Sequence, residues 1–284
     1  MTGMNTDQDP IAAWANGTLS AEMAVARLLL RWRDLDTVRS ELRRHAGAGQ
    51  LLAVLYRHHV AVPRLLAILA RADRTATQRD GLAECRDLFD EAVALNPAMA
   101  VAVYSLGDEG LLAEATAELI GHLASLGIGT PRQHLLDLGC GTGRLVAALA
   151  ERVAGIVGID LSPAMIEAAR RRCAGLAGVE LRSCSGRDLS EFPDQSFDAV
   201  VAVDSFPYLY RAGGRGLAQQ HVHEAARVLR SPGDLVILNL SYRGDVALDV
   251  ADAASFAAQG RLDLVRAGTR DLRSWDGLTF HFRR

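Results

Sequence analysis

Three glycines occupy alternate positions at the point in the sequence best suited to bind a ligand. Gly139, Gly141 and Gly143 lie in the segment HLLDLGCGTGRLV, between one apolar run and the start of the next. A glycine-rich turn between a strand and a helix lets a ligand approach the backbone closely, and the start of the helix offers unpaired N–H groups. The pattern therefore predicts a site for a nucleotide-like ligand.

The spacing of the glycines helps to distinguish between nucleotide-like ligands. The dinucleotide fingerprint is G-x-G-x-x-G, whose last glycine allows the helix to pack closely on the strand. Arg144 occupies the position of that third glycine here, which disfavours a nicotinamide dinucleotide. Asp160 ends the run GIVGID and offers a carboxylate that binds ribose hydroxyls in any site of this type, so it does not choose between cofactors.

The segment LLDLGCGTGRL resembles the first motif of the class I S-adenosylmethionine-dependent methyltransferases. GIVGIDLSPAMI, GRDLSEFPDQSFDAVV and EAARVLRSPGDLVILNL resemble later blocks of that family, in the same order, and the resemblance covers about residues 101–284. It implies that S-adenosylmethionine is the cofactor, that Asp160 binds its ribose and that Asp188 contacts its adenine amino group.

We expect the methionine portion of the cofactor to lie over the glycine turn. Cys140 is then a small residue of that turn rather than a nucleophile. Tyr104 is either a lid whose ring faces the sulfonium or a core aromatic, and both interpretations stay open. The predicted cofactor-binding residues are Tyr104, Asp137, Gly139, Cys140, Gly141, Gly143, Asp160, Leu161, Met165, Arg187, Asp188, Leu189 and Val203.

Polar side chains follow the fourth and fifth expected strands, in VDSFPYLY and NLSYRGD. Open parallel sheets bind ligands at the carboxyl ends of their strands, so these segments predict the site of the methyl acceptor. The predicted catalytic residues are Asp204, Tyr208, Tyr242 and Arg243. Methyl transfer needs mainly in-line positioning, and a base is required only if the acceptor loses a proton.

The chemical class of the acceptor stays open between an amine, an amino acid and a hydroxyl compound. Arg243 is suited to a bidentate pair with a substrate carboxylate. The two segments faintly resemble their counterparts in glycine N-methyltransferases, but Asp204 replaces an asparagine of that pattern. Two alternatives to an enzyme of this family are a non-catalytic S-adenosylmethionine-binding protein and a nucleotide-dependent oxidoreductase.

We predict no metal ion. Asp204, Asn239 and Asp245 offer the oxygen ligands that magnesium prefers, but their spacing lacks the adjacent Asp-Asn pair of catechol-type methyltransferases. His221 and His223 point to different faces of a helix and are expected on the surface.

Composition excludes several other functions. All 31 cationic residues are arginine, so Schiff-base chemistry and a Walker phosphate loop, which need lysine, are both excluded. The net charge of -3 and the 5% aromatic content disfavour a nucleic-acid partner. Four cysteines without a C-x-x-C pair and a polar amino terminus predict a cytoplasmic protein with reduced thiols. Charged residues within 51–72 argue against a membrane span.

The residues up to about 100 have helical apolar spacing, with Ser20 and Asp34 as expected helix caps. We expect residues 1–100 to form a helical region that acts as a substrate cap, a homodimer contact or a partner-binding module. Residues 101–284 alternate strands and helices and predict a doubly wound, mostly parallel seven-stranded α/β sheet, with a helix over LAQQHVHEAARVLR (residues 217–230) before the fifth strand. Its last two strands should form an antiparallel hairpin with a tight turn at Trp275-Asp276-Gly277.

Overall fold

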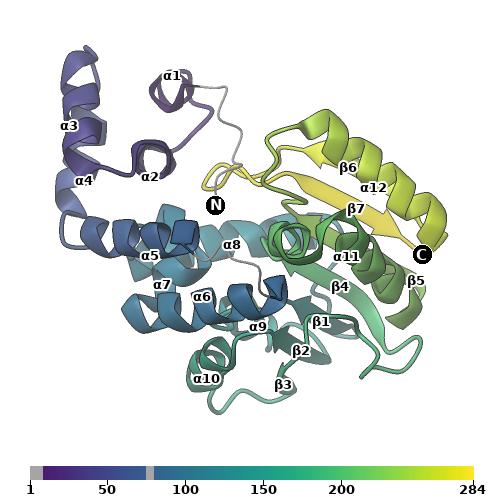
Figure 1. Ribbon diagram of the computed structural model, residues 1–284. Helices are drawn as coiled ribbons and strands as arrows, with labels where there is room; N and C mark the ends of the chain where they lie inside the picture. Colours follow the sequence, from purple (N-terminus) through teal and green to yellow (C-terminus); the bar gives the residue numbers. More distant parts are fainter. Residues whose placement is uncertain (1–8, 75–79) are drawn as a thin grey trace.

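A seven-stranded sheet of order β3-β2-β1-β4-β5-β7-β6 is the centre of the computed structural model, which describes residues 9–74 and 80–284 (Figure 1). Strands β1 to β5 are parallel, and β7 pairs antiparallel with both β5 and β6. The predicted sheet and its carboxy-terminal hairpin are therefore confirmed. The strands are β1 (His134–Leu138), β2 (Gly155–Asp160), β3 (Val179–Ser183), β4 (Phe197–Val203), β5 (Leu229–Leu238), β6 (Asp263–Thr269) and β7 (Thr279–Arg283).

Helices cover both faces of this sheet, as a doubly wound fold requires. One face packs against α8, α9 and α10, and the other packs against α11 and α12. Four successive residues of β1 are buried, which is typical of a parallel strand covered on both faces. The bounds are α8 (Glu109–Ser125), α9 (Arg144–Leu149), α10 (Pro163–Arg172), α11 (Phe206–Val228) and α12 (Val246–Gly260).

The amino-terminal part is helical, as expected. Ser20 and Asp34 cap their helices by accepting hydrogen bonds from the backbone N–H groups of Met23 and Thr37. Figure 1 shows this purple and blue region to the left of the sheet. Its elements are α1 (Pro10–Ala15), α2 (Ala21–Trp32), α3 (Leu35–Arg44), α4 (Gly49–Arg57), α5 (Val62–Arg74), α6 (Gly81–Leu95), α7 (Pro97–Val101) and η1 (Val103–Ser105).

Helix α6 links the two faces of the sheet. It packs against both α10 and α11, which lie on opposite faces. An element that contacts both must cross the sheet at an outer strand or at the ends of its strands, and the α6 residues Leu82, Cys85 and Phe89 line a cavity with residues that follow β2 and β4. The helical region thus covers the carboxyl ends of these strands, where a ligand is expected.

Two local predictions were wrong. Trp275-Asp276-Gly277 is not a tight turn, because β6 ends at Thr269 and β7 begins at Thr279, with a longer loop between them. Helix α11 begins at Phe206 rather than near residue 217, and its non-helical break lies at Gly213 and Gly214. The VDSFPYLY segment therefore continues from a strand end directly into a helix.

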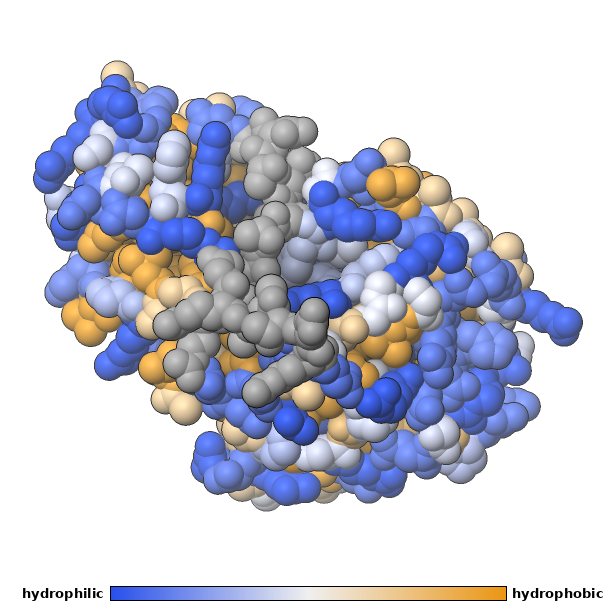
Figure 2. Space-filling view, viewed as in Figure 1, coloured by the Kyte–Doolittle hydropathy of each residue, from blue (hydrophilic) through white to orange (hydrophobic). Residues whose placement is uncertain are grey.

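No single helix in the described part of the chain is long and apolar enough to cross a membrane; α4 and the first part of α5 reach that composition only as a pair bent by 83°. Hydrophobic residues gather on the left of the molecule, over the amino-terminal helices, in the space-filling view (Figure 2).

Candidate functional site

One cavity joins the glycine turn to the polar segment after β4. Its walls come from the carboxyl ends of β1, β2 and β4, from α2, α6 and η1, and from the loop of residues 270–278. The space between protein atoms within it is about 1470 Å³, including solvent at its mouth. It holds twelve of the predicted site residues: Tyr104, Asp137, Gly139, Cys140, Gly141, Asp160, Leu161, Met165, Val203, Asp204, Tyr208 and Tyr242.

The turn has no room for side chains at two of its glycines, because other segments of the protein pack closely against it. Gly139 has a φ of +81°, and a Cβ there would lie 2.5 Å from the Cβ of Ser205. Gly141 has a φ of +53°, and a Cβ there would lie 2.6 Å from Cγ1 of Val101 in α7. Close approach of a ligand is therefore not the only reason for these glycines. They also let the helical region and the β4–α11 junction close over the turn.

Asp160 ends β2 beside this turn, and both of its carboxylate oxygens accept a backbone hydrogen bond. Oδ2 accepts from the N–H of Gly141 at 2.9 Å, and Oδ1 accepts from the N–H of Ser162 at 2.9 Å. Burial raises the pKa of Asp160 to about 6, although these hydrogen bonds oppose the shift. The orientation of the carboxylate is fixed while lone pairs are left for a ligand.

Asp137 and Arg144 are opposite charges on either side of the turn. The Oδ2 atom of Asp137 is buried without a hydrogen-bond partner among the described residues, and burial raises its pKa to about 7. The guanidinium of Arg144 is also buried and donates to the hydroxyls of Thr116 and Tyr104, at 3.2 and 3.3 Å. An unsatisfied buried carboxylate oxygen is costly, so this end of the cavity is prepared for a donor from a ligand.

Asp204 lies at the end of β4 in a strained conformation, with a φ of +58°. Its Oδ1 accepts a hydrogen bond from Nδ2 of Asn239, and its Oδ2 accepts one from the hydroxyl of Tyr242, both at 2.7 Å. Burial raises the pKa of Asp204 to about 6, against the effect of both donors. Asn239, at the end of β5, also has a positive φ of +73°. Two adjacent strand ends thus bring a carboxyl and an amide together.

A second tyrosine, Tyr208, packs beside this arrangement. Its ring meets that of Tyr242 edge to face, with the centroids 5.8 Å apart. Burial raises the pKa of both phenols. Because Tyr242 donates its one proton to Asp204, the Tyr242 oxygen keeps lone pairs that can accept a hydrogen bond from a ligand.

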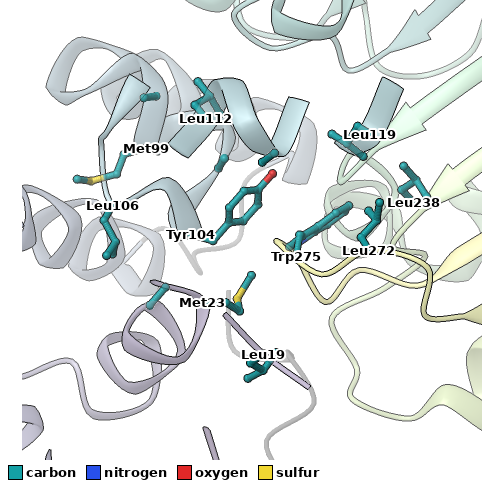
Figure 3. Packing of buried hydrophobic residues seen from close by; sticks show 14 of the residues in the cluster. Leu19, Met23, Met99, Tyr104, Leu106, Leu112, Leu119, Leu238, Leu272 and Trp275 are labelled. Carbon is teal, nitrogen blue, oxygen red and sulfur yellow. The ribbon is translucent and has the colours of Figure 1, made fainter. Parts of the chain in front are cut away.

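Aromatic side chains form a further part of the cavity wall. The rings of Tyr104 and Trp275 are stacked with centroids 6.1 Å apart, and Figure 3 shows Tyr104 pointing toward Trp275, with Met23 of α2 nearby. Phe89 of α6 meets Tyr208 edge to face at 4.7 Å. All five side chains line the cavity. The position of Tyr104 is compatible with both roles predicted for it.

Five predicted site residues lie outside the cavity lining: Gly143, Arg187, Asp188, Leu189 and Arg243. The carboxylate of Asp188 accepts hydrogen bonds from the backbone and side chain of Ser190. Arg187 pairs with Asp80 at 2.6 Å. The segment after β3 contributes Cys184 and Gly186 to the lining.

Arg243 is engaged within the protein. Its guanidinium pairs with Asp249 and Asp252, at 2.5 and 2.8 Å, and lies over the ring of Tyr210. The geometry therefore gives no support to a role in binding a substrate carboxylate in this cavity. Spacing along NLSYRGD could not show this, because Asp249 and Asp252 belong to the next helix.

The residues weighed as metal ligands are separated. Asp204 and Asn239 bond to each other, whereas Asp245 is exposed and caps α12 through the N–H of Leu248. Within residues 9–74 and 80–284, no group of three or more His, Cys, Asp or Glu is placed to hold a metal ion. His221 is buried and lines the cavity, so its predicted surface position was wrong, whereas His223 is exposed.

The residues that sequence reasoning missed come mostly from the helical region and the last loop. Arg144 directly follows the glycine turn, and a cation at that point was a signal for a ligand role. The other missed residues carry no local signal, because only packing brings them to the cavity. They include Met23, Ala26, Leu30, Leu82, Cys85, Phe89, Leu119, Cys184, Gly186, Ser205, Leu209, His221 and Trp275.

Comparison with known proteins agrees with this geometry. A family model described as a methyltransferase domain matches residues 135–233. The chain is 37% identical over 113 residues to demethylmenaquinone methyltransferase from Tropheryma whipplei (strain Twist), covering 40% of this chain and 44% of that protein. It is 38% identical over 108 residues to phosphatidylethanolamine N-methyltransferase from Cereibacter sphaeroides, covering 37% and 49%. The chain thus spans less than half the length of these curated relatives.

Solved structures share the fold over a larger part of the chain. Magnesium protoporphyrin IX methyltransferase from Synechocystis PCC 6803, with bound SAM, aligns with a TM-score of 0.55 at 18% identity. The alignment covers 74% of this chain and 99% of that one. A SAM-dependent methyltransferase from Leishmania major aligns with the same TM-score at 16% identity, covering 72% and 83%.

Proposed function

Because residues 135–233 form a class I S-adenosylmethionine-dependent methyltransferase domain, we propose that the protein transfers a methyl group from this cofactor to a small-molecule acceptor. The single observation that carries the proposal is that one cavity contains both the groups suited to the cofactor, Asp137, Arg144 and Asp160, and a candidate proton acceptor, Asp204. When bound, S-adenosylmethionine supplies a methyl group on a positively charged sulfonium, which is a good leaving group.

The residues around the glycine turn fit this cofactor. The carboxylate of Asp160 has lone pairs left for ribose hydroxyls in addition to the backbone hydrogen bonds that it accepts from Gly141 and Ser162. The unpartnered Oδ2 of Asp137 would accept from the methionine ammonium. Arg144, the buried cation beside it, would hold the methionine carboxylate. Leu161 and Met165 offer apolar contacts for the adenine.

The acceptor half of the cavity lies by Asp204, Tyr208 and Tyr242. Alignment of the acceptor atom with the methyl group at roughly 3 Å supplies most of the rate in a displacement of this kind. An acceptor that must lose a proton also needs a base. The hydrogen bond from Tyr242 to Asp204 offers a path for that proton, and the carboxyl of Asp204 accepts it. The non-catalytic alternative leaves this strained polar arrangement without a purpose.

We further propose that the amino-terminal helices act as the cap of the acceptor site. The support is that α2, α6 and η1 contribute side chains to the cavity. A homodimer contact or a partner-binding role for these helices stays a prediction, as do a cytoplasmic location and the absence of a nucleic-acid or membrane partner.

Calorimetric titration of the protein with S-adenosylmethionine and with NADH tests the cofactor assignment. We expect binding of the methyl donor and none of NADH. The substitution Asp160→Ala should weaken S-adenosylmethionine by roughly 10- to 100-fold, since a hydrogen bond to a charged group contributes about 1.5–3 kcal/mol. Asp245→Ala, which removes an exposed carboxylate that caps α12, should leave the affinity unchanged. Tight binding of NADH without a response to S-adenosylmethionine would refute the proposal.

A further inference from the structure

The acceptor half of the cavity has aromatic and aliphatic walls. Met23 and Ala26 come from α2, Tyr104 from η1, Leu119 from α8 and Trp275 from the loop of residues 270–278. Apart from the hydroxyl of Tyr104, which is hydrogen-bonded to Arg144, and the indole N–H of Trp275, these side chains carry no polar atoms. Walls of this kind bind flat apolar molecules through area burial and ring stacking.

The loop that carries Trp275 is held in place from two directions. Glu118 of α8 accepts hydrogen bonds from the backbone N–H groups of Arg273 and Ser274, at 2.7 and 2.9 Å. Asp276 forms an ion pair with Arg27 of α2, and both side chains are more than nine-tenths buried. Trp275 itself is 2% exposed. The indole is therefore a fixed wall of the cavity and not a side chain that swings in from solvent.

Few charges face this half of the cavity. Asp204 is the only carboxylate in it among the described residues, and both of its oxygens are engaged by Asn239 and Tyr242. The terminal nitrogens of Arg144 donate to Thr116 and Tyr104, and Arg144 is the residue that we assign to the methionine carboxylate. Arg243, the other cation predicted to bind a substrate carboxylate, pairs with Asp249 and Asp252 outside the cavity. No free cation is thus left here, within the described chain, for the carboxylate of an amino acid.

The hydroxyl that leads to the base decides which acceptor group fits. Tyr242 donates its proton to Asp204, so its own oxygen keeps lone pairs that accept one hydrogen bond from a ligand. A neutral hydroxyl satisfies that position with its single proton. An ammonium would bring a full charge and three donors into apolar walls, where unpaired donors cost free energy.

Resting on the proposed function, we propose that the acceptor is an uncharged aromatic hydroxyl compound, whose ring lies between α2, Tyr104 and Trp275 and whose hydroxyl donates to Tyr242. In the reaction the acceptor's O–H bond breaks and its oxygen bonds to the methyl carbon. The electron pair of the broken carbon–sulfur bond stays on sulfur, which becomes a neutral thioether. The acceptor's proton passes to the oxygen of Tyr242, while the proton of Tyr242 passes to Asp204.

Two naphthalene probes of similar size and different charge test this proposal. The protein is saturated with S-adenosylhomocysteine and titrated calorimetrically at neutral pH with 2-naphthol, which is uncharged, and with 2-naphthylmethylamine, which is a cation. We expect 2-naphthol to bind and the amine to bind at least about tenfold more weakly, since one unpaired polar group in an apolar site costs 1–3 kcal/mol. Equal or tighter binding of the amine would overturn the proposal.

Tryptophan variants locate the probe. Trp275→Ala should weaken 2-naphthol by about tenfold or more, because a ring contact and its buried area are lost, while S-adenosylhomocysteine binds as before. Trp32→Ala is the matched control, since Trp32 is 41% exposed at the end of α2 and does not line the cavity. If S-adenosylhomocysteine fails to bind the unmodified protein, the proposed function fails; if it binds and 2-naphthol does not, only the acceptor class is wrong.

Discussion

At the scale of a single residue, Asp137 is a predicted ligand-binding group whose burial lowers the free energy of unfolding as the pH rises. Its pKa is raised from 3.8 to about 7 by burial, so the folded protein keeps a proton that the unfolded chain releases above about pH 4. Between these two values the unfolded state binds fewer protons, and stability falls as pH rises. Above pH 7 the folded protein carries a buried carboxylate with one unpartnered oxygen.

We therefore predict that Asp137→Asn stabilises the cofactor-free protein at pH 8, by an amount on the order of 1–4 kcal/mol, with little effect at pH 4. The same substitution should weaken S-adenosylhomocysteine, since the amide cannot pair with an ammonium charge. Thermal unfolding at the two pH values, with and without the ligand, measures both effects. A loss of stability at pH 8 without ligand would contradict the assignment.

Asp204 predicts a pH dependence of activity at the same scale. Its pKa is raised to about 6, and only the ionised carboxyl accepts a proton. At saturating cofactor, the rate should fall about tenfold per pH unit below pH 6 and level off above it. Asp204→Asn should abolish this dependence and lower the rate by roughly 10²- to 10⁴-fold. A rate that stays constant between pH 5 and 7 would exclude Asp204 as the proton acceptor.

At the scale of an element, the glycine turn is a joint between protein segments as well as a ligand surface. Gly141→Ala introduces a Cβ at 2.6 Å from Cγ1 of Val101, in a left-handed conformation that L-residues avoid. We expect a loss of about 1–3 kcal/mol in the free energy of unfolding.

The matched control for this turn is Gly121→Ala in α8, where a Cβ meets nothing within 4 Å and alanine should stabilise the helix by about 0.5–1 kcal/mol. Chemical denaturation of both variants gives the comparison. Equal stability of Gly141→Ala and the unmodified protein would show that α7 does not press on the turn.

At the scale of the whole molecule, the chain closes over its site from both ends of the sequence. Helix α2 and the β6–β7 loop meet through the buried pair Arg27–Asp276. The pKa of Arg27 is lowered to about 10 by burial and by Arg270, so it stays charged at neutral pH. Removal of one partner leaves the other charge buried and alone.

Arg27→Met or Asp276→Leu alone should therefore destabilise the protein by about 3–5 kcal/mol. The double variant Arg27→Met with Asp276→Leu should recover most of that loss, because an apolar pair of similar volume replaces the charges. A double-mutant cycle from denaturation curves tests this coupling between α2 and the loop. Additive losses would mean that the two side chains do not interact.

The sequence by itself determined the sheet, its cofactor side and several helix caps, because these depend on local patterns. HLLDLGCGTGRLV and GIVGID place Gly139, Gly141 and Asp160 through a turn and an adjacent parallel strand, with few steps of chain between them. The order of the remaining strands and the hairpin followed from the alternation of strand and helix patterns. The start of α11 did not, because the apolar pattern around Phe206 and Pro207 does not predict a helix there.

Only the tertiary structure decided the acceptor side. Met23, Phe89 and Trp275 line the same cavity as Tyr208, and they come from helices and a loop that are far apart in sequence, so no spacing predicts their proximity. Arg243 looked available beside Tyr242, but Asp249 and Asp252 in the following helix engage its charge. The cofactor site arises from consecutive backbone geometry, while the acceptor site arises from long-range packing, and that physical difference separates what could be predicted from what could not.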